Sequence, residues 1–181
     1  MYKGNNPIAL ESQEMIIKAM LSIMETEPFK SITVKNLCER ALVSRQTFYS
    51  LFDCKEEVLE LHFDRMFDLF IKRYISKENI TMSSICTEFV AYIEYDKDFI
   101  LLLVNNNLTY IMTLKFEEYL IKIGSILKVD RKYMYEYAMA FMAGALVEVV
   151  ARYIRDKNNI QGKELAYLIE DILKGEYFIV H

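Results

Sequence analysis

The stretch from Ser31 to Leu59 decides the fold, and it reads SITVKNLCERALVSRQTFYSLFDCKEEVL. Thr33 is a residue type that caps helix N-termini, and the apolar residues after it recur at the i, i+3, i+4 spacing of one helix face. Ser44 is a second cap, ahead of a short helix whose apolar residues Phe48 and Phe52 are four apart. The stretch therefore predicts two short helices joined by a tight turn.

The outward face of the second short helix carries hydrogen-bonding side chains. They are Arg45, Gln46, Thr47, Tyr49 and Ser50. A short helix anchored by two aromatic residues, with polar side chains on its free face, suits insertion into the major groove of DNA.

This segment resembles the helix-turn-helix of the TetR family of bacterial transcriptional regulators, whose pattern runs roughly T-x-x-x-I-A-x-x-A-G-V-S-x-x-T-x-Y-x-x-F-x-x-K-E-x-L. The resemblance covers about the first third of the chain. Its matching positions are Thr33, Leu37, Cys38, Ala41, Val43, Ser44, Thr47, Tyr49, Phe52, Lys55, Glu56 and Val58.

Capping geometry and the family's use of these positions give each residue an expected role. Base edges are read by Arg45, Gln46 and Thr47. Phosphates are held by Thr33, Ser44, Tyr49 and Lys55. The positive patch is local, built from Lys35, Arg45 and Lys55, and Ser50 completes the expected contact surface.

Three positions depart from the family pattern. The turn glycine is replaced by Leu42, which costs about 1 kcal/mol if the residue is left-handed. The polar cap before the next helix is replaced by Cys54, so we expect Asp53 to cap instead, with Glu56 completing a capping box. Leu51 replaces a Tyr or His that often touches phosphate, which weakens the expected phosphate grip.

Composition points to an all-α fold. The 181 residues include only five Gly and two Pro, fewer than a sheet protein needs for its turns. The 3.6-residue period predicts helices over 12–26, 55–75, 83–94, 96–104, 108–127, 133–157 and 162–178, after a flexible leader over 1–10. With the two short helices this makes about nine, as the resemblance also implies. We expect a DNA-binding domain over 1–54 and an effector-binding and dimerisation domain over 55–181.

The helix over 55–75 belongs to both domains, because it starts beside the recognition helix and ends in the larger domain. It is the natural lever between them. His62 in this helix is expected to be an ordinary packed or capped histidine, and Asp130 is expected to cap the helix over 133–157.

Aromatic and Met side chains are dense between the lever and the late helices, and a hydrophobic fraction of 53% exceeds what a minimal bundle needs. They form either plain core or the wall of a cavity, and the resemblance implies a small-molecule effector there. An apolar, mostly uncharged ligand fits best. The candidate lining residues are Phe63, Met66, Phe67, Phe70, Tyr92, Phe99, Leu103, Tyr110, Phe116, Met139 and Met142.

The helix over 133–157 is apolar almost all round, so it must be buried on several sides. It is either a central core helix or, with the last helix, the four-helix interface of a homodimer that the resemblance implies. The residues expected at this interface are Phe141, Gly144, Ala145, Glu148, Arg152, Leu165, Leu168, Ile169 and Ile172.

Other classes of function find little support. No phosphate-binding Gly-rich loop, paired-His metal motif or nucleophile elbow is present, and the adjacent Glu117 and Glu118 do not share one helix face. Three distant cysteines and two His give no metal or disulfide spacing, so we expect no metal, no cofactor and a soluble cytoplasmic protein with reduced thiols. No membrane partner is expected.

Charge keeps one alternative open. The net charge is −4, and residues 1–60 hold seven Lys or Arg against nine Asp or Glu, a net of −2. A DNA-binding domain usually shows a basic footprint. The main interpretation is a repressor released from a palindromic DNA operator by a small molecule; the alternative is a helical adaptor that acts through a protein partner.

Overall fold

The computed structural model describes residues 1–75, 80–126, 135–156 and 160–177. Within these ranges the chain forms nine α-helices, one 3-10 turn and no strand, which confirms the all-α fold. The elements are α1 Pro7–Met24, the 3-10 turn Phe29–Ser31, α2 Val34–Ala41, α3 Arg45–Leu51, α4 Glu56–Ile75, α5 Met82–Tyr95, α6 Lys97–Asn105, α7 Thr109–Ile126, α8 Tyr135–Arg155 and α9 Gly162–Lys174. The predicted cap Asp130 and the predicted helix ends at 127, 133, 157 and 178 lie outside the described residues.

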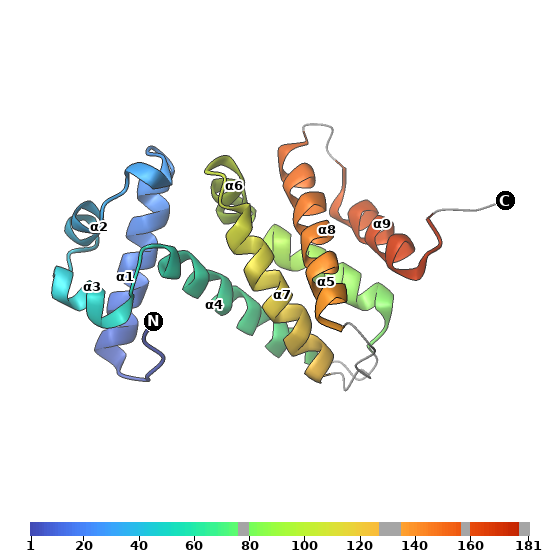
Figure 1. Cartoon of the computed structure of the whole chain (residues 1–181), viewed down its shortest axis with the longest axis horizontal. Helices are drawn as coiled ribbons and strands as arrows, with labels where there is room; N and C mark the ends of the chain where they lie inside the picture. The colour runs from blue at the N-terminus through green and yellow to red at the C-terminus, as the bar shows by residue number, and fades with distance from the viewer. Residues whose placement is uncertain (76–79, 127–134, 157–159, 178–181) are drawn as a thin grey trace.

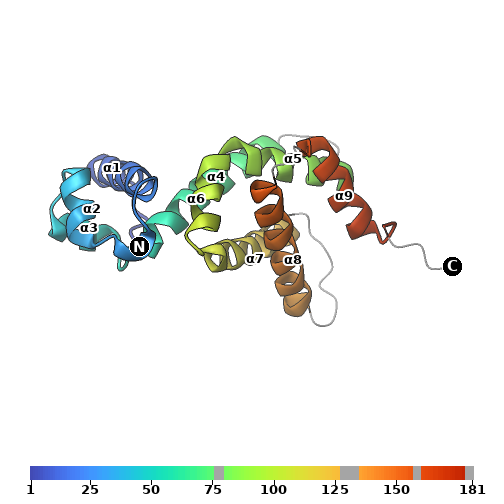
Figure 2. The same cartoon turned by 90° about the horizontal axis from the view of Figure 1, so that it is seen from above.

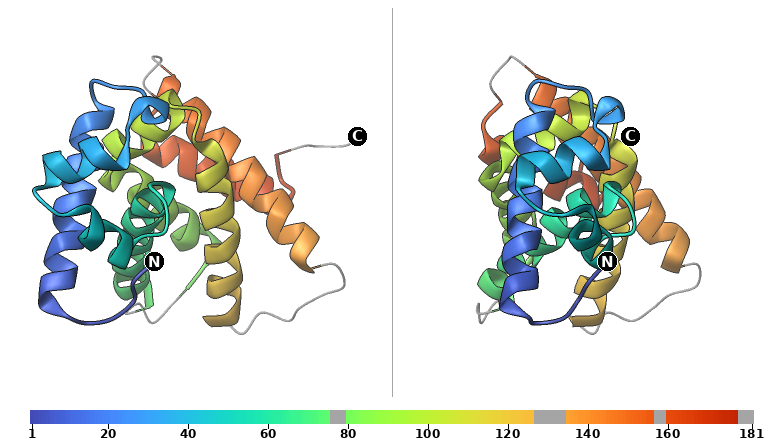
Figure 3. Two further views of the ribbon diagram at one scale, coloured as in Figure 1. Left: turned by 60° about the vertical axis from the view of Figure 1, so that its left-hand side comes forward. Right: turned by 90° about the vertical axis from the view of Figure 1, so that its left-hand side faces the viewer.

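The helices form two lobes joined by α4 (Figure 1). We call residues 1–55, with α1–α3, the head, and α4–α9 the body. Seen from above, α4 runs from the head into the body, α9 lies at the end of the body away from the head, and α8 lies between α6 and α9 (Figure 2). The head thus presents α2 and α3 at one end of the molecule (Figure 3).

The head is a three-helix unit with a small, closely packed core. Ile16 and Met20 of α1 and Leu37 of α2 are fully buried, as are Phe48 and Phe52. The last two rings lie 5.5 Å apart between centroids. This aromatic pair fixes α3 against the other two helices.

The predicted flexible leader is wrong, because residues 1–6 belong to the head. The backbone N–H of Tyr2 donates to the Leu51 carbonyl at 2.8 Å, and the Gln13 side chain donates to the Tyr2 carbonyl at 3.1 Å. Helix α1 begins at Pro7 instead of residue 12, with Asn6 as its cap. Proline suits the first helical position because its missing N–H would have no partner there. At the other end, α1 stops at Met24, short of the residue 26 expected from sequence.

Polar contacts tie the head to the body. The side-chain carbonyl of Asn106, in the turn after α6, accepts from the Phe29 backbone N–H at 2.7 Å. On α4, Arg65 pairs with Glu14 of α1. These contacts connect α4 and the α6–α7 turn directly to the head.

His62 is a packed histidine, as expected, and it also has a partner. Its Nε2 lies 2.6 Å from a carboxylate oxygen of Asp96, and its ring meets the edge of Phe99 at 4.5 Å between centroids. Asp96 also caps α6 by accepting from the Phe99 N–H at 3.3 Å. The contacts of His62 with Asp96 and Phe99 therefore join α4 to α6.

Candidate DNA-binding surface and ligand cavity

The helix-turn-helix has the predicted caps. The Thr33 hydroxyl accepts from the Asn36 N–H at 3.1 Å at the start of α2, and Ser44 accepts from the Thr47 N–H at 2.9 Å at the start of α3. Between them Leu42 has φ 57° and ψ 37°, the left-handed conformation that the turn requires. The local sequence therefore determines both helix starts and the turn.

The outward face of α3 is free. Arg45, Gln46, Tyr49 and Ser50 are exposed and Thr47 is half-buried, while the helix rests on Phe48 and Leu51. These are the residues predicted to face DNA.

The polar groups of this face differ in how free they are. Arg45 pairs with no carboxylate within the part of the chain that the structure describes, so its guanidinium remains available. The Ser50 hydroxyl already donates to the Thr47 carbonyl at 2.7 Å. Tyr49 rests edge-on against Phe48, with 5.4 Å between the ring centroids. Arg45, Gln46 and Tyr49 are thus the side chains best placed to reach a partner.

Lys55 is turned inward, contrary to the predicted phosphate contact. Its ammonium donates to the carbonyls of Phe29 and Ile32 at 2.7 and 2.9 Å, and lies 4.2 Å from the centre of the Phe29 ring. It anchors the 3-10 turn to the start of α4, because one ammonium binds the carbonyls at both ends of that turn.

Two further expectations about the head need qualification. Lys35 is exposed as predicted, but its ammonium lies 3.9 Å from the Glu39 carboxylate on the same helix. The predicted Asp53–Glu56 capping box does not form: the Asp53 N–H donates to Glu57 at 2.8 Å instead. The accepting carboxylate is one position later than expected, because α4 begins only at Glu56.

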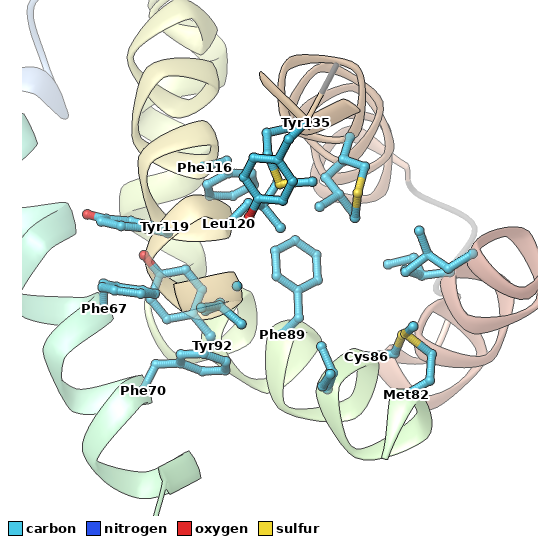
Figure 4. A pocket seen from close by; sticks show the side chains of 18 residues that line it. Phe67, Phe70, Met82, Cys86, Phe89, Tyr92, Phe116, Tyr119, Leu120 and Tyr135 are labelled. Carbon is cyan, nitrogen blue, oxygen red and sulfur yellow. The ribbon is translucent and has the colours of Figure 1, made fainter. Parts of the chain in front are cut away.

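The body contains a partly open cavity of about 400 Å³ between α4, α5, α7, α8 and α9. Figure 4 shows its lining side chains, with Phe67, Phe70, Tyr92 and Tyr119 at the end beside α4. Six predicted residues line it: Phe67, Phe70, Tyr92, Phe116, Met139 and Met142. Sequence reasoning missed twelve others: Met82, Ile85, Cys86, Phe89, Tyr119, Leu120, Ile123, Gly124, Tyr135, Leu146, Ile169 and Leu173.

The sequence contains a signal for four of the lining residues that were not predicted. Met82, Ile85, Cys86 and Phe89 follow one another at the i, i+3, i+4, i+7 spacing of a single α5 face. The spacing identifies an inward face, but it does not show whether that face meets side chains or a void.

Five predicted lining residues lie elsewhere. Phe63, Phe99 and Leu103 are fully buried and Met66 nearly so, and none of the four lines this cavity. Met66 instead borders a second pocket between α4 and α5. Phe63 meets Phe99 edge to face at 4.9 Å, where α4 packs on α6. Tyr110 is half exposed. The apolar face of each of these two helices is wide enough to contact more than one other helix. The part of it that carries Phe63 on α4, or Phe99 and Leu103 on α6, packs against other side chains and not against the cavity.

No charged side chain is among the described residues that line the cavity. Burial raises the pKa of the Cys86 thiol to about 11, so the thiol stays protonated. The cavity therefore favours an uncharged ligand, because burying an unpaired charge in such surroundings is costly.

A polar network links the cavity wall to α4. The Tyr119 ring lines the cavity and stacks on Phe67 at 3.8 Å between centroids, and its hydroxyl donates to Asp64 of α4 at 3.0 Å. Asp64 also pairs with the buried Lys115 at 2.5 Å, and Lys115 donates to Glu118 at 2.7 Å. Burial alone would lower the pKa of Lys115, but the hydrogen bonds to both carboxylates raise it, so the ammonium stays charged.

The residues predicted for a dimer interface fall into two groups. On α8, Phe141, Gly144, Ala145, Glu148 and Arg152 are exposed together, and Arg152 lies 3.8 Å from Glu148. This outward face is available to a partner.

On α9 the prediction is only partly right. Leu165 and Ile169 are buried within the protomer, because α9 packs mainly on α5, and they cannot form an exposed interface. Ile172 is exposed and Leu168 is half-buried. The apolar face of α9 therefore packs mainly inside the protomer.

The comparisons with known proteins agree with this architecture. No family model matches the sequence. The HTH-type dhaKLM operon transcriptional activator DhaS of Lactococcus lactis is 34% identical over 56 residues, which is 31% of this chain and 30% of that relative. The chain thus matches about a third of the length of this curated relative.

Solved structures share the whole fold. Lin0861 from Listeria innocua superposes with a TM-score of 0.82 at 19% identity, over 97% of this chain and 96% of that one. FadR from Thermus thermophilus, a TetR-family transcriptional repressor in complex with lauroyl-CoA, gives 0.61 at 14% identity over 93% and 96%. At such identities the likeness concerns the fold.

Proposed function

Because the chain has the fold of TetR-family transcriptional regulators, we propose that it is a DNA-binding transcriptional regulator controlled by a small molecule. The exposed face of α3 carries this proposal. It presents Arg45, Gln46 and Tyr49 at the end of the molecule away from the cavity, on a helix held firmly by buried aromatic residues. Such a helix suits reading base edges in the major groove.

A gel shift with the DNA upstream of the protein's own gene tests this proposal. Native protein should shift this fragment at concentrations that leave a scrambled fragment of equal length unshifted. The affinity should fall as salt rises, since phosphate contacts release counterions. Equal binding to both fragments, or no binding at low salt, would refute a sequence-specific regulator.

A protein-binding adaptor is the second candidate. The acidic balance of residues 1–60 and the inward position of Lys55 favour it, because both reduce the attraction between the head and phosphates. An adaptor would fail the gel shift while keeping a folded head, which the thermal unfolding curve of the same sample reports.

We further propose that the cavity binds an uncharged apolar effector and that α4 transmits the signal. Tyr119 and Phe67 form the cavity wall where it touches α4, and Arg65 of α4 pairs with the head. A ligand shifts the state of the head only by its differential affinity for the two states, so operator DNA must weaken ligand binding by the same factor. Titrating one compound into free and operator-bound protein measures both.

The proposed direction of control is repression. The FadR neighbour is a repressor and the DhaS relative is an activator. Transcription in vitro from the upstream fragment should fall when the protein is added and recover with ligand. A rise on adding protein would make it an activator.

The protein is proposed to act as a homodimer through the exposed face of α8. One α3 reads only a few base pairs, so specificity requires two half-sites related by the symmetry of the protein. A Cβ added at Gly144 meets nothing within 4 Å in the protomer. Gly144→Ala should therefore leave the protomer folded but weaken a closely packed dimer, and sedimentation equilibrium measures the dissociation constant. A native monomer at micromolar concentration would exclude the dimer.

The proposed location is the cytoplasm. By length and composition α8 would also be able to span a membrane. Its exposed face carries Glu148 and Arg152, which suits a protein partner better than lipid.

A further inference from the structure

The hydroxyl of Tyr92 has no hydrogen-bond partner. It is the one buried side-chain oxygen or nitrogen without a partner in the described part of the chain. The Tyr92 ring lines the cavity, packs edge-on against Phe70 at 5.7 Å, and directs its hydroxyl toward α4 (Figure 4). A buried hydroxyl left unpaired is costly, so a partner that occupies this end of the cavity would be favoured.

The surroundings of this hydroxyl carry negative charge. Burial raises the pKa of Tyr92, and the nearby carboxylates of Asp64 and Asp96 raise it further, so the phenol stays protonated and offers a donor. Lys115, the one buried cation among the described residues, is already paired with both Asp64 and Glu118. An anionic ligand would therefore meet repulsion here and find no unpaired buried cation in the described ranges.

We propose that the effector is an apolar molecule with one neutral hydrogen-bond acceptor, such as a ketone or ester carbonyl, and that this group accepts from the Tyr92 hydroxyl. This inference rests on the proposed role of the cavity as the effector site. In this proposal the carbonyl lies at the α4 end of the cavity, where the Tyr92 hydroxyl points, and the new contact breaks no existing hydrogen bond of that hydroxyl.

Three test compounds separate the possible ligand chemistries. Octanophenone has a ketone, and octylbenzene has the same carbon skeleton without an acceptor. The third compound, the carboxylate 8-phenyloctanoate, has this skeleton and carries a negative charge. Isothermal titration measures the affinity of each for native protein, for Tyr92→Phe and for Tyr153→Phe. The last variant is the matched control, because the Tyr153 hydroxyl donates to Glu94 at 2.7 Å and does not line the cavity.

Native protein should bind octanophenone about two- to ten-fold more tightly than octylbenzene, the worth of one hydrogen bond. Phenyloctanoate should bind more weakly than the ketone. The preference for the ketone should vanish in Tyr92→Phe and persist in Tyr153→Phe. The melting temperature of Tyr92→Phe should not fall, because its missing hydroxyl was unpaired, and this shows that the lost preference does not reflect unfolding.

Several results would overturn the inference: a ketone preference that survives in Tyr92→Phe, no preference in native protein, tighter binding of the anion, or no binding of any compound. The gel shift with operator DNA uses no ligand. A regulator with a different effector would pass that gel shift and fail these titrations, whereas a failure of the proposed function would appear in the gel shift itself.

Discussion

The head and the body carry their candidate sites in opposite ways. In the head, the polar side chains of α3 lie outside a closely packed core that is centred on the fully buried Phe48 and Phe52. In the body, the candidate site is the inner wall of a cavity that five helices build around Tyr92 and Tyr119. The proposed function of the head therefore requires tight local packing, whereas the proposed function of the body requires packing that is locally incomplete.

The largest expected difference concerns aromatic residues. Phe48→Ala should cost about 3–5 kcal/mol of stability, because it empties a fully packed site in the head. Phe89→Ala should cost clearly less, since that ring is only half-buried and already borders the cavity. Urea unfolding of both variants measures the contrast. Equal losses would show that the cavity is filled in solution and would remove the distinction.

Ion pairs should differ in the opposite direction, with the larger loss of stability in the body. Asp64→Asn removes one charged partner of the buried Lys115 and should cost about 1.5–3 kcal/mol. The exposed Lys35–Glu39 pair of the head provides the control, and Glu39→Gln should change stability by about 0–1 kcal/mol. Thermal unfolding of the two variants in the same buffer measures both losses of stability. A loss from Glu39→Gln as large as that from Asp64→Asn would contradict this account.

Arg45→Ala should affect binding without affecting stability. Its exposed guanidinium pairs with no carboxylate in the described ranges, so the folded protein loses nothing, while specific DNA affinity should fall by about 1–3 kcal/mol. Quantitative gel shifts measure the loss. Lys18→Ala on α1 removes the same charge from an exposed position and should leave the affinity for operator nearly unchanged. If both variants bind alike, α3 is not the recognition helix.

The smallest effect concerns two backbone positions with φ 57°, one in each lobe. Leu42→Gly should stabilise the head by up to about 1 kcal/mol, because Leu is strained in the left-handed region and its side chain is 84% exposed. Asn107→Gly in the body should change stability less, since Asn tolerates this conformation better. Melting temperatures of the two variants test the order.

The sequence by itself determined the helix-turn-helix of the head. Thr33 and Ser44 set the two helix starts through hydrogen bonds that span three residues, and the αL turn at Leu42 follows from the same short segment. Interactions of such short range are encoded locally, so the exposed face of α3 could be predicted. The inward turn of Lys55 could not, because its acceptors lie 23 and 26 residues away.

Only the tertiary structure decided the body. The period of each helix predicted an apolar face, but Phe63 and Phe67, four residues apart on α4, face solid core and cavity respectively. Leu165 and Ile169 were expected at a partner surface and are buried against α5 instead. Burying an apolar side chain lowers the free energy whether it packs against the same protomer, a ligand or a second chain. The apolar pattern of a helix therefore does not show which of the three covers it. That choice depends on how helices distant in the sequence are placed around one another.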